Sequence, residues 1–251
     1  MLEIDNLSIE IVRKPIVRDF SGAFPAGTLT SIIGPNGAGK STLLRAIAGL
    51  LPLTRGTVLY EQKDLLSLSP RRRARKVSYL PQTMEYASSY PVSLFVELAG
   101  YPWSDQWDEP WRQEHLHRCL DLCNVYALRH RDIATLSGGE RQCVYLAQVM
   151  YQNTPIVLLD EPNSFLDLKN MVLIENILSR IRDEGRSILL VTHDLQTVQR
   201  ISTNVVAMKD GGLFIAGDPQ SVLNSSVISE LFDLDSSAVR ERFQWTLADN
   251  K

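Results

Sequence analysis

Residues 34–41, Gly-Pro-Asn-Gly-Ala-Gly-Lys-Ser, match the G-x-x-x-x-G-K-[ST] pattern of a phosphate-binding loop in full. The pattern requires a strand before it and a helix after it. Residues 28–33 are predicted to form that strand, and residues 42–50 an amphipathic helix. Glycine permits backbone angles at which several N–H groups point at one anion, and the helix N-terminus adds a dipole that favours phosphate. The segment therefore predicts a strand–loop–helix unit that holds the phosphates of a nucleotide.

Two side chains of this loop have a predicted chemical role beyond backbone contact. Lys40 can reach the β- and γ-phosphates as a point charge, and the Ser41 hydroxyl is placed to ligate Mg²⁺. The predicted nucleotide contacts of the loop are Gly34, Pro35, Asn36, Gly37, Ala38, Gly39, Lys40, Ser41 and Thr42.

An apolar run that ends in two carboxylates adds a second constraint. Residues 156–159 are aliphatic and lead into Asp160 and Glu161, which predicts a buried strand with both acids at its C-terminal end, where α/β sheets place their ligands. Asp160 is expected to hold Mg²⁺ through its hydration shell, and Glu161 to orient and polarise an attacking water as general base. The alternative is that the two acids cap a following helix.

The composition is that of an ordinary globular protein. Hydrophobic residues make up 44% and charged residues 22% of the 251 residues, which argues against disorder, collagen and coiled coil. The 26 Lys and Arg against 29 Asp and Glu give a net charge of −3, so no global basic field draws in nucleic acid, and we expect none as a partner. We find no apolar run of the about 20 residues needed to span a membrane and no signal peptide, and the odd cysteine count fits a reducing interior. These features predict a cytoplasmic protein.

Short aliphatic segments alternate with helical patterns along most of the chain, which predicts an α/β fold with a parallel sheet wrapped by helices. Residues 92–131 interrupt this alternation with helical patterns that contain Pro102 and Pro110, which indicates an inserted helical lobe. Two short amphipathic segments, residues 219–223 and 227–234, form a tail. The predicted strands are residues 28–33, 57–60, 77–80, 156–159, 187–191, 205–209 and 213–216.

Residues 136–142, Leu-Ser-Gly-Gly-Glu-Arg-Gln, contain a second helix start suited to an anion. Ser137 is a good N-cap, Glu140 follows three residues later as in a capping box, and Gly138 and Gly139 permit close approach of the backbone to a phosphate. Taken alone, the string is equally a well-capped helix. Together with the phosphate loop and the two acids, it resembles the signature motif of the ATP-binding cassette (ABC) family.

The resemblance covers about residues 2–223 and implies roles for further residues, with ATP and Mg²⁺ as the bound ligands. Gln82 resembles the Q-loop glutamine between the nucleotide site and the helical lobe, residues 163–167 resemble the D-loop, and His193 resembles the switch histidine. The implied catalytic set is Glu161, His193, Gln82 and Lys40; the nucleotide contacts gain Ser137, Gly138, Gly139 and Asp167; and the metal set is Ser41, Gln82 and Asp160.

The resemblance also implies an architecture. A P-loop NTPase core of mainly parallel sheet flanked by helices is expected from residues 1–88 and 148–218, with an antiparallel β region near the N-terminus. Residues 89–147 are expected to form a helical signature subdomain, and residues 219–251 a C-terminal helical tail.

In the family the signature of one subunit faces the phosphate loop of another, which implies a head-to-tail homodimer that closes on ATP and opens after hydrolysis. Separate transmembrane permease subunits docked at residues 82–98, a substrate-binding protein and a place on the cytoplasmic side of the inner membrane are implied as well. Residues 79–82, 100–103 and 217–219 resemble importers of iron-siderophore, haem and cobalamin, so the expected cargo is a metal chelate.

Other assignments stay open at this point. A soluble ABC ATPase, such as one that assembles iron–sulfur clusters, would share the motifs and would lack membrane partners. Exporters and other importers share them too. A P-loop kinase or other phosphotransferase is disfavoured by the signature string.

The chain departs from the family pattern where an aromatic residue usually stacks on adenine. That place corresponds to Ile11 or Val12, so we expect a purely apolar adenine contact. Cys143 stands where a basic residue is common, and we expect no loss of catalysis from it.

Three further clusters have ordinary structural interpretations. The basic run at residues 71–76 is predicted to be a solvated helix face. The tryptophans at 103, 107 and 111 are predicted to make core or subunit contacts. A zinc site is disfavoured because the spacing puts both cysteines on an apolar helix face; its candidate ligands would be His115, His117, Cys119 and Cys123.

Overall fold

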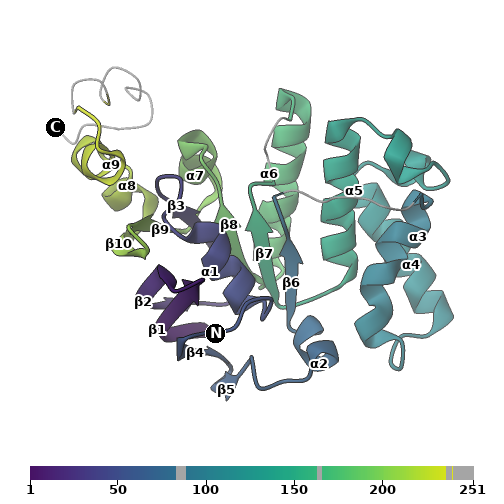
Figure 1. Ribbon diagram of the computed structural model, residues 1–251. Coiled ribbons are helices and arrows are strands. Elements are labelled where there is room, and N and C mark those ends of the chain that lie inside the picture. Colours follow the sequence, from purple (N-terminus) through teal and green to yellow (C-terminus); the bar gives the residue numbers. More distant parts are fainter. Residues whose placement is uncertain (83–88, 163–165, 236–238, 240–251) are drawn as a thin grey trace.

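Two β-sheets, one antiparallel and one mainly parallel, form the framework of the computed structural model, which describes residues 1–82, 89–162, 166–235 and 239 (Figure 1). The antiparallel sheet has the strand order β2-β1-β4-β5, and the larger sheet has the order β10-β9-β3-β8-β7-β6. The strands are β1 (Leu2–Ile11), β2 (Lys14–Phe24), β3 (Leu29–Ile33), β4 (Arg55–Tyr60), β5 (Lys63–Asp64), β6 (Val77–Leu80), β7 (Ile156–Asp160), β8 (Ser187–Val191), β9 (Asn204–Lys209) and β10 (Gly212–Gly217).

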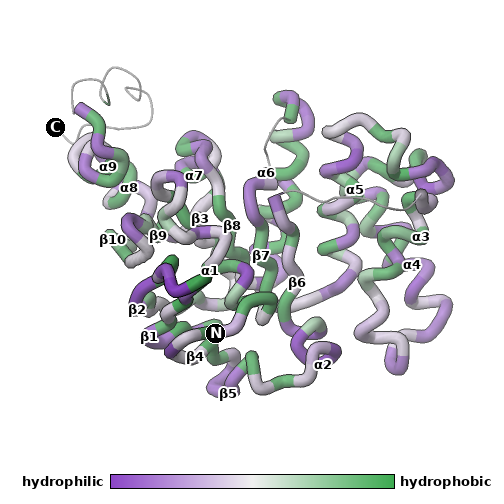
Figure 2. Tube along the Cα trace, viewed as in Figure 1, coloured by the Kyte–Doolittle hydropathy of each residue, from purple (hydrophilic) through white to green (hydrophobic). Residues whose placement is uncertain are grey.

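The larger sheet is parallel from β9 to β6, and β10 adds an antiparallel strand at its edge. All residues of β3, β7 and β8 are buried. Continuous aliphatic runs are expected in strands that helices cover on both faces, and Figure 2 shows the middle of this sheet as largely hydrophobic. Every strand predicted from the sequence is confirmed, with ends that differ by at most two residues.

Helices surround this sheet. In Figure 1, α3, α4 and α5 stand together as a lobe beside the β6 edge, and α8 and α9 lie near β10 at the opposite end. The helices are α1 (Lys40–Ile47), α2 (Pro70–Ala74), α3 (Val92–Glu97), α4 (Glu109–Leu122), α5 (Gly138–Tyr151), α6 (Leu168–Asp183), α7 (Leu195–Ile201), α8 (Pro219–Val222) and α9 (Ser225–Phe232), with 3-10 turns η1 (Leu98–Trp103), η2 (Tyr126–Leu128) and η3 (Ile133–Thr135).

The two faces of the larger sheet belong to different cores. Along β7, Val157 and Leu159 pack with residues of α3 to α6, whereas Ile156 and Leu158 pack with α1 and the antiparallel sheet. This division follows from the period of two in a strand, which sends alternate side chains to opposite faces. A third cluster joins α7, α8 and α9 to β9.

The chain enters and leaves most of the helical lobe at one place. Pro91 and Asp132 form an isolated antiparallel bridge. On either side of it, the Val92 N–H donates to the Arg131 carbonyl at 3.0 Å, and the Ile133 N–H donates to the Tyr90 carbonyl at 3.0 Å. The two ends of this insertion are therefore pinned together by backbone hydrogen bonds.

Arginines at α2 tie the lobe to the core. The carbonyl of Pro102 in η1 accepts hydrogen bonds from Arg71 Nε at 3.1 Å and from Arg75 Nε at 2.7 Å. Arg75 also pairs with Asp105, and its guanidinium lies 5.2 Å from the ring centre of Trp103. The prediction of a solvated face for the basic run is therefore wrong for Arg75, because η1 packs against α2 and supplies partners for it.

The two N-terminal strands were not predicted individually. Their pairing contains register shifts between Ile4 and Leu7 and again between Leu7 and Ile9. Such irregularities break the strict alternation of apolar and polar residues by which a strand is recognised. Among the helices of the described residues, none has the length and apolar character that crossing a membrane requires.

Candidate active site

The C-terminal ends of four parallel strands bring the predicted site residues together. β3 leads into the phosphate loop, β6 into Gln82, and β8 into His193, while β7 ends at Asp160. The strand pairs β6–β7, β7–β8 and β8–β3 are parallel and adjacent, so these ends meet at one edge of the sheet. They face a cleft of about 800 Å³ that is lined by Lys14, Pro15, Ile16, Arg18, Asn36, Gly37, Gly39, Lys40, Ser41, Thr42, Gln82, Glu161, His193, Asp210 and Gly211.

Lys40 is held inside the phosphate loop. Its ammonium donates to the carbonyl of Gly34 at 2.8 Å and to that of Pro35 at 2.9 Å, and the residue is 6% exposed. Burial lowers the pKa of Lys40, and the nearby charges of Glu161 and Asp160 counteract this shift. The ammonium is thus positioned at the start of α1, where an anion would replace the carbonyls as its partner.

Asp160 is a buried acid with two hydroxyl partners. The Ser41 hydroxyl donates to its Oδ1 at 2.9 Å, and the Tyr79 hydroxyl lies 3.3 Å from its Oδ2. Burial raises the pKa of Asp160, while the bond from Ser41 opposes that shift. Burial, together with the charge of Asp160, also raises the pKa of Tyr79. Tyr79 was not predicted as a site residue, although the period of two along β6 sets its side chain on the opposite face from Leu80.

Glu161 lies between Gln82 and His193, two of the three other predicted catalytic side chains. Its Oε2 accepts a hydrogen bond from Gln82 Nε2 at 2.8 Å, and its Oε1 lies 2.6 Å from His193 Nε2. The backbone of Glu161 has a φ of 52°, which is uncommon for a residue other than glycine, and its N–H donates to the Val191 carbonyl at 2.9 Å. Such strained backbone is often found at functional sites.

The signature residues lie elsewhere in the chain. Ser137 caps α5 in a complete capping box, with the Ser137 N–H donating to Glu140 Oε2 at 2.8 Å and the Glu140 N–H donating to the Ser137 hydroxyl at 3.3 Å. Neither Ser137, Gly138 nor Gly139 lines the cleft. The structure of this single chain therefore does not bring the signature to the phosphate loop.

Asp167 has a capping role in this structure. Its carboxylate accepts a hydrogen bond from the Asn170 N–H at 2.8 Å, at the first turn of α6. The preceding D-loop residues 163–165 lie outside the described residues, as do residues 83–88 after Gln82.

The far end of the cleft differs from what the sequence led us to expect. Ile11 and Val12 do not line it, and Val12 is 95% exposed in the turn between β1 and β2. The lining residues from β2 are instead Lys14, Pro15, Ile16 and Arg18. The register shifts in β1 and β2 prevented their placement from the sequence, because a strand period cannot be followed through them.

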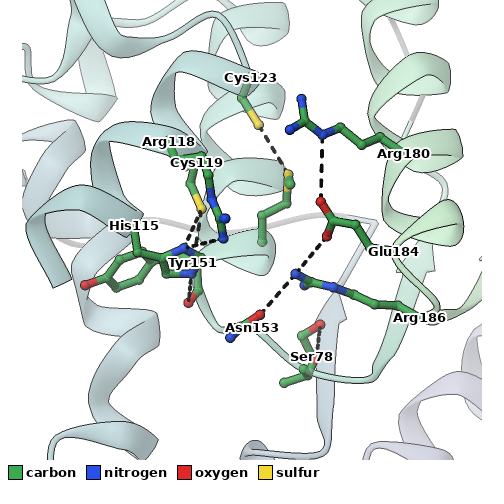
Figure 3. A network of polar contacts seen from close by, with 12 residues as sticks. Ser78, His115, Arg118, Cys119, Cys123, Tyr151, Asn153, Arg180, Glu184 and Arg186 are labelled. Carbon is green, nitrogen blue, oxygen red and sulfur yellow. Dashed lines mark hydrogen bonds and ion pairs between the residues drawn. The ribbon is translucent and has the colours of Figure 1, made fainter. Parts of the chain in front are cut away.

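Three of the four candidate zinc ligands, His115, Cys119 and Cys123, belong to a packed core instead (Figure 3), whereas His117 is exposed and its Nδ1 lies 3.5 Å from Asp121 Oδ2. The ring of His115 stacks on that of Tyr151 at 5.1 Å between centroids, and its Nε2 lies 3.2 Å from the Tyr151 carbonyl oxygen. Burial lowers the pKa of His115 to about 4 and raises that of Cys119 to about 12. Cys119 and Cys123 both lie in the hydrophobic cluster of the lobe, which confirms their predicted apolar face. Among the described residues there is no group of three or more potential metal ligands.

The fold and the cleft define a P-loop nucleotide-binding protein, because a buried strand runs into a glycine-rich loop and a neighbouring strand ends in acids beside it. Residues 17–164 match the family model for the ABC transporter domain. The chain is 36% identical over 244 residues to a probable iron chelatin transport ATP-binding protein of Helicobacter pylori (strain ATCC 700392 / 26695), a match that covers 95% of each chain. The chain therefore belongs to the ABC transporter family, and it is an ATP hydrolase.

Two further similarities agree with this family. The chain is 32% identical over 238 residues to the petrobactin import ATP-binding protein FpuD of Bacillus anthracis, covering 93% of this chain and 87% of the relative. A solved structure of a dimeric ATP-binding cassette, in a post-hydrolysis state with ADP and Pi, has a TM-score of 0.78 at 24% identity. It covers 87% of this chain and 99% of the solved one, and it establishes the fold.

Proposed function

We propose that this chain is the ATP-hydrolysing subunit of an importer that takes up a metal chelate through separate transmembrane subunits. The hydrolytic part rests on one observation: Glu161 lies between Gln82 and His193 in the cleft that also contains Lys40. The import of a metal chelate is supported by relatives that are named for iron chelatin transport and petrobactin import.

In the proposed reaction, the phosphate loop binds the ATP phosphates and Lys40 neutralises part of their charge. Glu161 accepts a proton from the attacking water as general base. Gln82 and His193 hold its two carboxylate oxygens, so that the carboxylate is oriented before the substrate arrives.

Mg²⁺ fits the residues beside the loop. The Ser41 hydroxyl and the Asp160 carboxylate, whose oxygens lie 2.9 Å apart, are the hard oxygen ligands that Mg²⁺ prefers. Gln82 would contribute its amide oxygen. When bound, Mg²⁺ neutralises charge on the phosphate oxygens. It would also offset the burial that raises the pKa of Asp160.

We further propose a head-to-tail homodimer in which Ser137, Gly138 and Gly139 of one chain contact the ATP bound by another. Asp167 would lie at the same interface. The capping box leaves the start of α5 as an ordered helix N-terminus suited to a phosphate, and the related solved cassette is dimeric. ATP would then stabilise the closed dimer, and hydrolysis would release it.

The surface that would receive the permease is the start of the helical lobe. Leu94, Leu98 and Tyr101 are 41%, 52% and 71% exposed and follow one another at helical spacing along α3 and η1. The proposed docking segment, residues 82–98, contains two of them. Trp103 of the same η1 turn lines a neighbouring cleft of about 410 Å³ with Arg72 and Lys76, so an apolar permease segment with an acidic side chain would fit here.

The test is purification of this chain from its native membranes in mild detergent, followed by identification of what accompanies it. The expected result is recovery with polytopic membrane subunits, and with a chelate-binding protein when the cargo is present. Leu98→Asp should release the chain from these partners, whereas Leu213→Asp, at an exposed apolar position on β10, should not. Recovery with soluble partners alone would leave the ATPase in place and reject the transport role in favour of a soluble ABC ATPase.

A further inference from the structure

A buried acid on α6 lies at the contact between α6 and α7. Glu175, in the middle of α6, is 8% exposed. Its Oε1 accepts a hydrogen bond from the Thr197 hydroxyl at 2.8 Å, and Arg200 donates to Oε1 from Nη2 at 2.5 Å and to Oε2 from Nε at 3.2 Å. Burying a carboxylate is costly unless it is paired and hydrogen-bonded. Both oxygens of Glu175 have such partners, and both partners belong to α7, so this acid ties the two helices together.

The Thr197 hydroxyl extends this contact to the start of α7. The residue is fully buried, and its Oγ1 lies 2.6 Å from Asp194 Oδ2 as well as 2.8 Å from Glu175 Oε1. A hydroxyl has a single proton to donate, so two carboxylates share it. Arg200 Nη2 lies 3.2 Å from the same hydroxyl and supplies a positive charge beside them. The hydrogen bond to Glu175 raises the pKa of Arg200. We call these four residues the α6–α7 network.

Asp194 is the member of the network nearest the nucleotide cleft. Its Oδ1 accepts from the Gln196 N–H at 2.9 Å and caps α7, and its own N–H donates to Thr192 Oγ1 at 3.1 Å. The intervening residue is His193, whose Nε2 lies 2.6 Å from Glu161 Oε1. The His193 side chain is 45% exposed. Because little packing surrounds it, its position depends on the backbone that the network holds.

We propose that Glu175 and Thr197 are positioning residues for His193, an inference that rests on the role in hydrolysis proposed above for His193 and Glu161. The network fixes the start of α7, and the start of α7 fixes the backbone of His193 at the end of β8. Hydrolysis is sensitive to this placement, since a displacement of about 1 Å can lower a rate by about 100-fold. Neither Glu175 nor Thr197 lines the cleft, so both act through His193 and not on ATP.

Thr197→Val tests the network, because it removes the hydroxyl and keeps the buried volume. We expect turnover at saturating ATP to fall by about tenfold, with the dissociation constant for ATP unchanged within about twofold. Thr197→Ser keeps the hydroxyl and should restore turnover to near the wild-type value. Wild-type turnover in Thr197→Val would overturn the proposal.

Thr154→Val is the matched control for the loss of a buried hydroxyl. Thr154 is 1% exposed, and its hydroxyl donates to the Ile156 carbonyl at 2.9 Å, at the opposite end of β7 from the cleft. Chemical denaturation should show that this variant loses about as much stability as Thr197→Val, while its turnover stays at the wild-type value. A loss of turnover in both variants would mean that lower stability, and not the position of His193, explains the effect.

A double-mutant cycle tests whether the network acts through His193. Thr197→Val should lower turnover by about tenfold in the wild-type chain and should have no further effect in His193→Ala. Glu175→Leu cuts the same contact from its other side and should behave in the same way. The same fall in turnover in both backgrounds would overturn the proposal.

A second readout does not depend on turnover. In the full-length chain, the NMR signal of the His193 ring nitrogens should move in Thr197→Val toward its position in Glu161→Ala, because both changes remove the contact between His193 and Glu161. The signal should stay in place in Thr154→Val. An unmoved signal in Thr197→Val would show that the network does not position His193.

The His193 variant also separates this proposal from the one on which it rests. Wild-type turnover in His193→Ala would show that His193 takes no part in hydrolysis, and the proposed catalytic arrangement would be wrong. Lost turnover in His193→Ala together with wild-type turnover in Thr197→Val would keep His193 in the site and reject Glu175 and Thr197 as its positioning residues.

Discussion

At the scale of single residues, the catalytic proposal depends on Glu161. Its carboxylate is held by Gln82 and His193, and its backbone is strained. Glu161→Gln keeps the shape and one hydrogen-bond acceptor but cannot take a proton. We expect turnover to fall by about 100-fold or more, with ATP binding retained and an ATP-bound dimer accumulating.

Turnover and size-exclusion chromatography with ATP would measure both effects. Glu230→Gln, on the exposed face of α9, is the control and should behave as wild type. Wild-type turnover in Glu161→Gln would remove Glu161 as the base.

His115 makes a prediction about stability and pH. Burial lowers its pKa from 6.5 to about 4, so the ring is neutral in the folded chain. Because the folded chain favours the neutral ring, His115 contributes its full stabilisation at a pH above 6.5, the pKa of the ring in the unfolded chain. That stabilisation is lost as the pH falls from 6.5 to about 4. The shift corresponds to about 3 kcal/mol.

The measurement is chemical denaturation of wild type and His115→Phe across this range, where Phe keeps the stacking on Tyr151. The difference in free energy of unfolding between the two chains should change with pH, and His117→Phe, at an exposed site on the same helix, should track wild type. A constant difference from pH 7 to pH 4 would show that His115 titrates normally.

At the scale of elements, the junction between α2 and η1 holds the lobe against the core. Arg75 provides a hydrogen bond to the Pro102 carbonyl and covers the ring of Trp103. Arg75→Ala is therefore expected to lower the free energy of unfolding by about 2 kcal/mol. Arg72→Ala, three residues earlier and exposed, is the matched control.

Thermal or chemical denaturation would measure the loss. Hydrogen exchange would locate it, since we expect η1 and α4 to exchange faster in Arg75→Ala than in Arg72→Ala. Equal stability of the two variants would mean that water replaces the contacts of Arg75 with no loss in the free energy of unfolding.

The start of α5 carries a prediction about pairing between chains. Ser137→Arg puts a long cation at the proposed contact with the partner's ATP and should abolish turnover. Lys40→Ala should do so through the phosphate loop. In a mixture, each mixed dimer would contain one intact composite site, so partial activity should return. A mixture as inactive as its components would argue against composite sites.

At the scale of the whole molecule, the parallel sheet and the phosphate loop could be predicted because each rests on a local pattern. The hydrophobicity of residues 156–159 is enough to predict a buried strand, which the structure confirms as β7. The direction of the chain then places the two acids at the C-terminal end of that strand. Two features could not be predicted. The β2 residues that line the cleft lie beside register shifts that obscure the strand period, and the contacts of Arg75 depend on η1, which lies about 30 residues further along the chain. Long-range packing decides both.

The bridge between Pro91 and Asp132 has a consequence for how such chains can diversify. Because the segment between them begins and ends at one point, its replacement leaves the ends of β6 and β7 where they are. The hydrolytic machinery and the proposed docking surface for a permease can therefore vary separately. A chimera that carries a relative's residues 91–132 should keep its turnover and change its membrane partner, which makes this lobe an interchangeable adaptor.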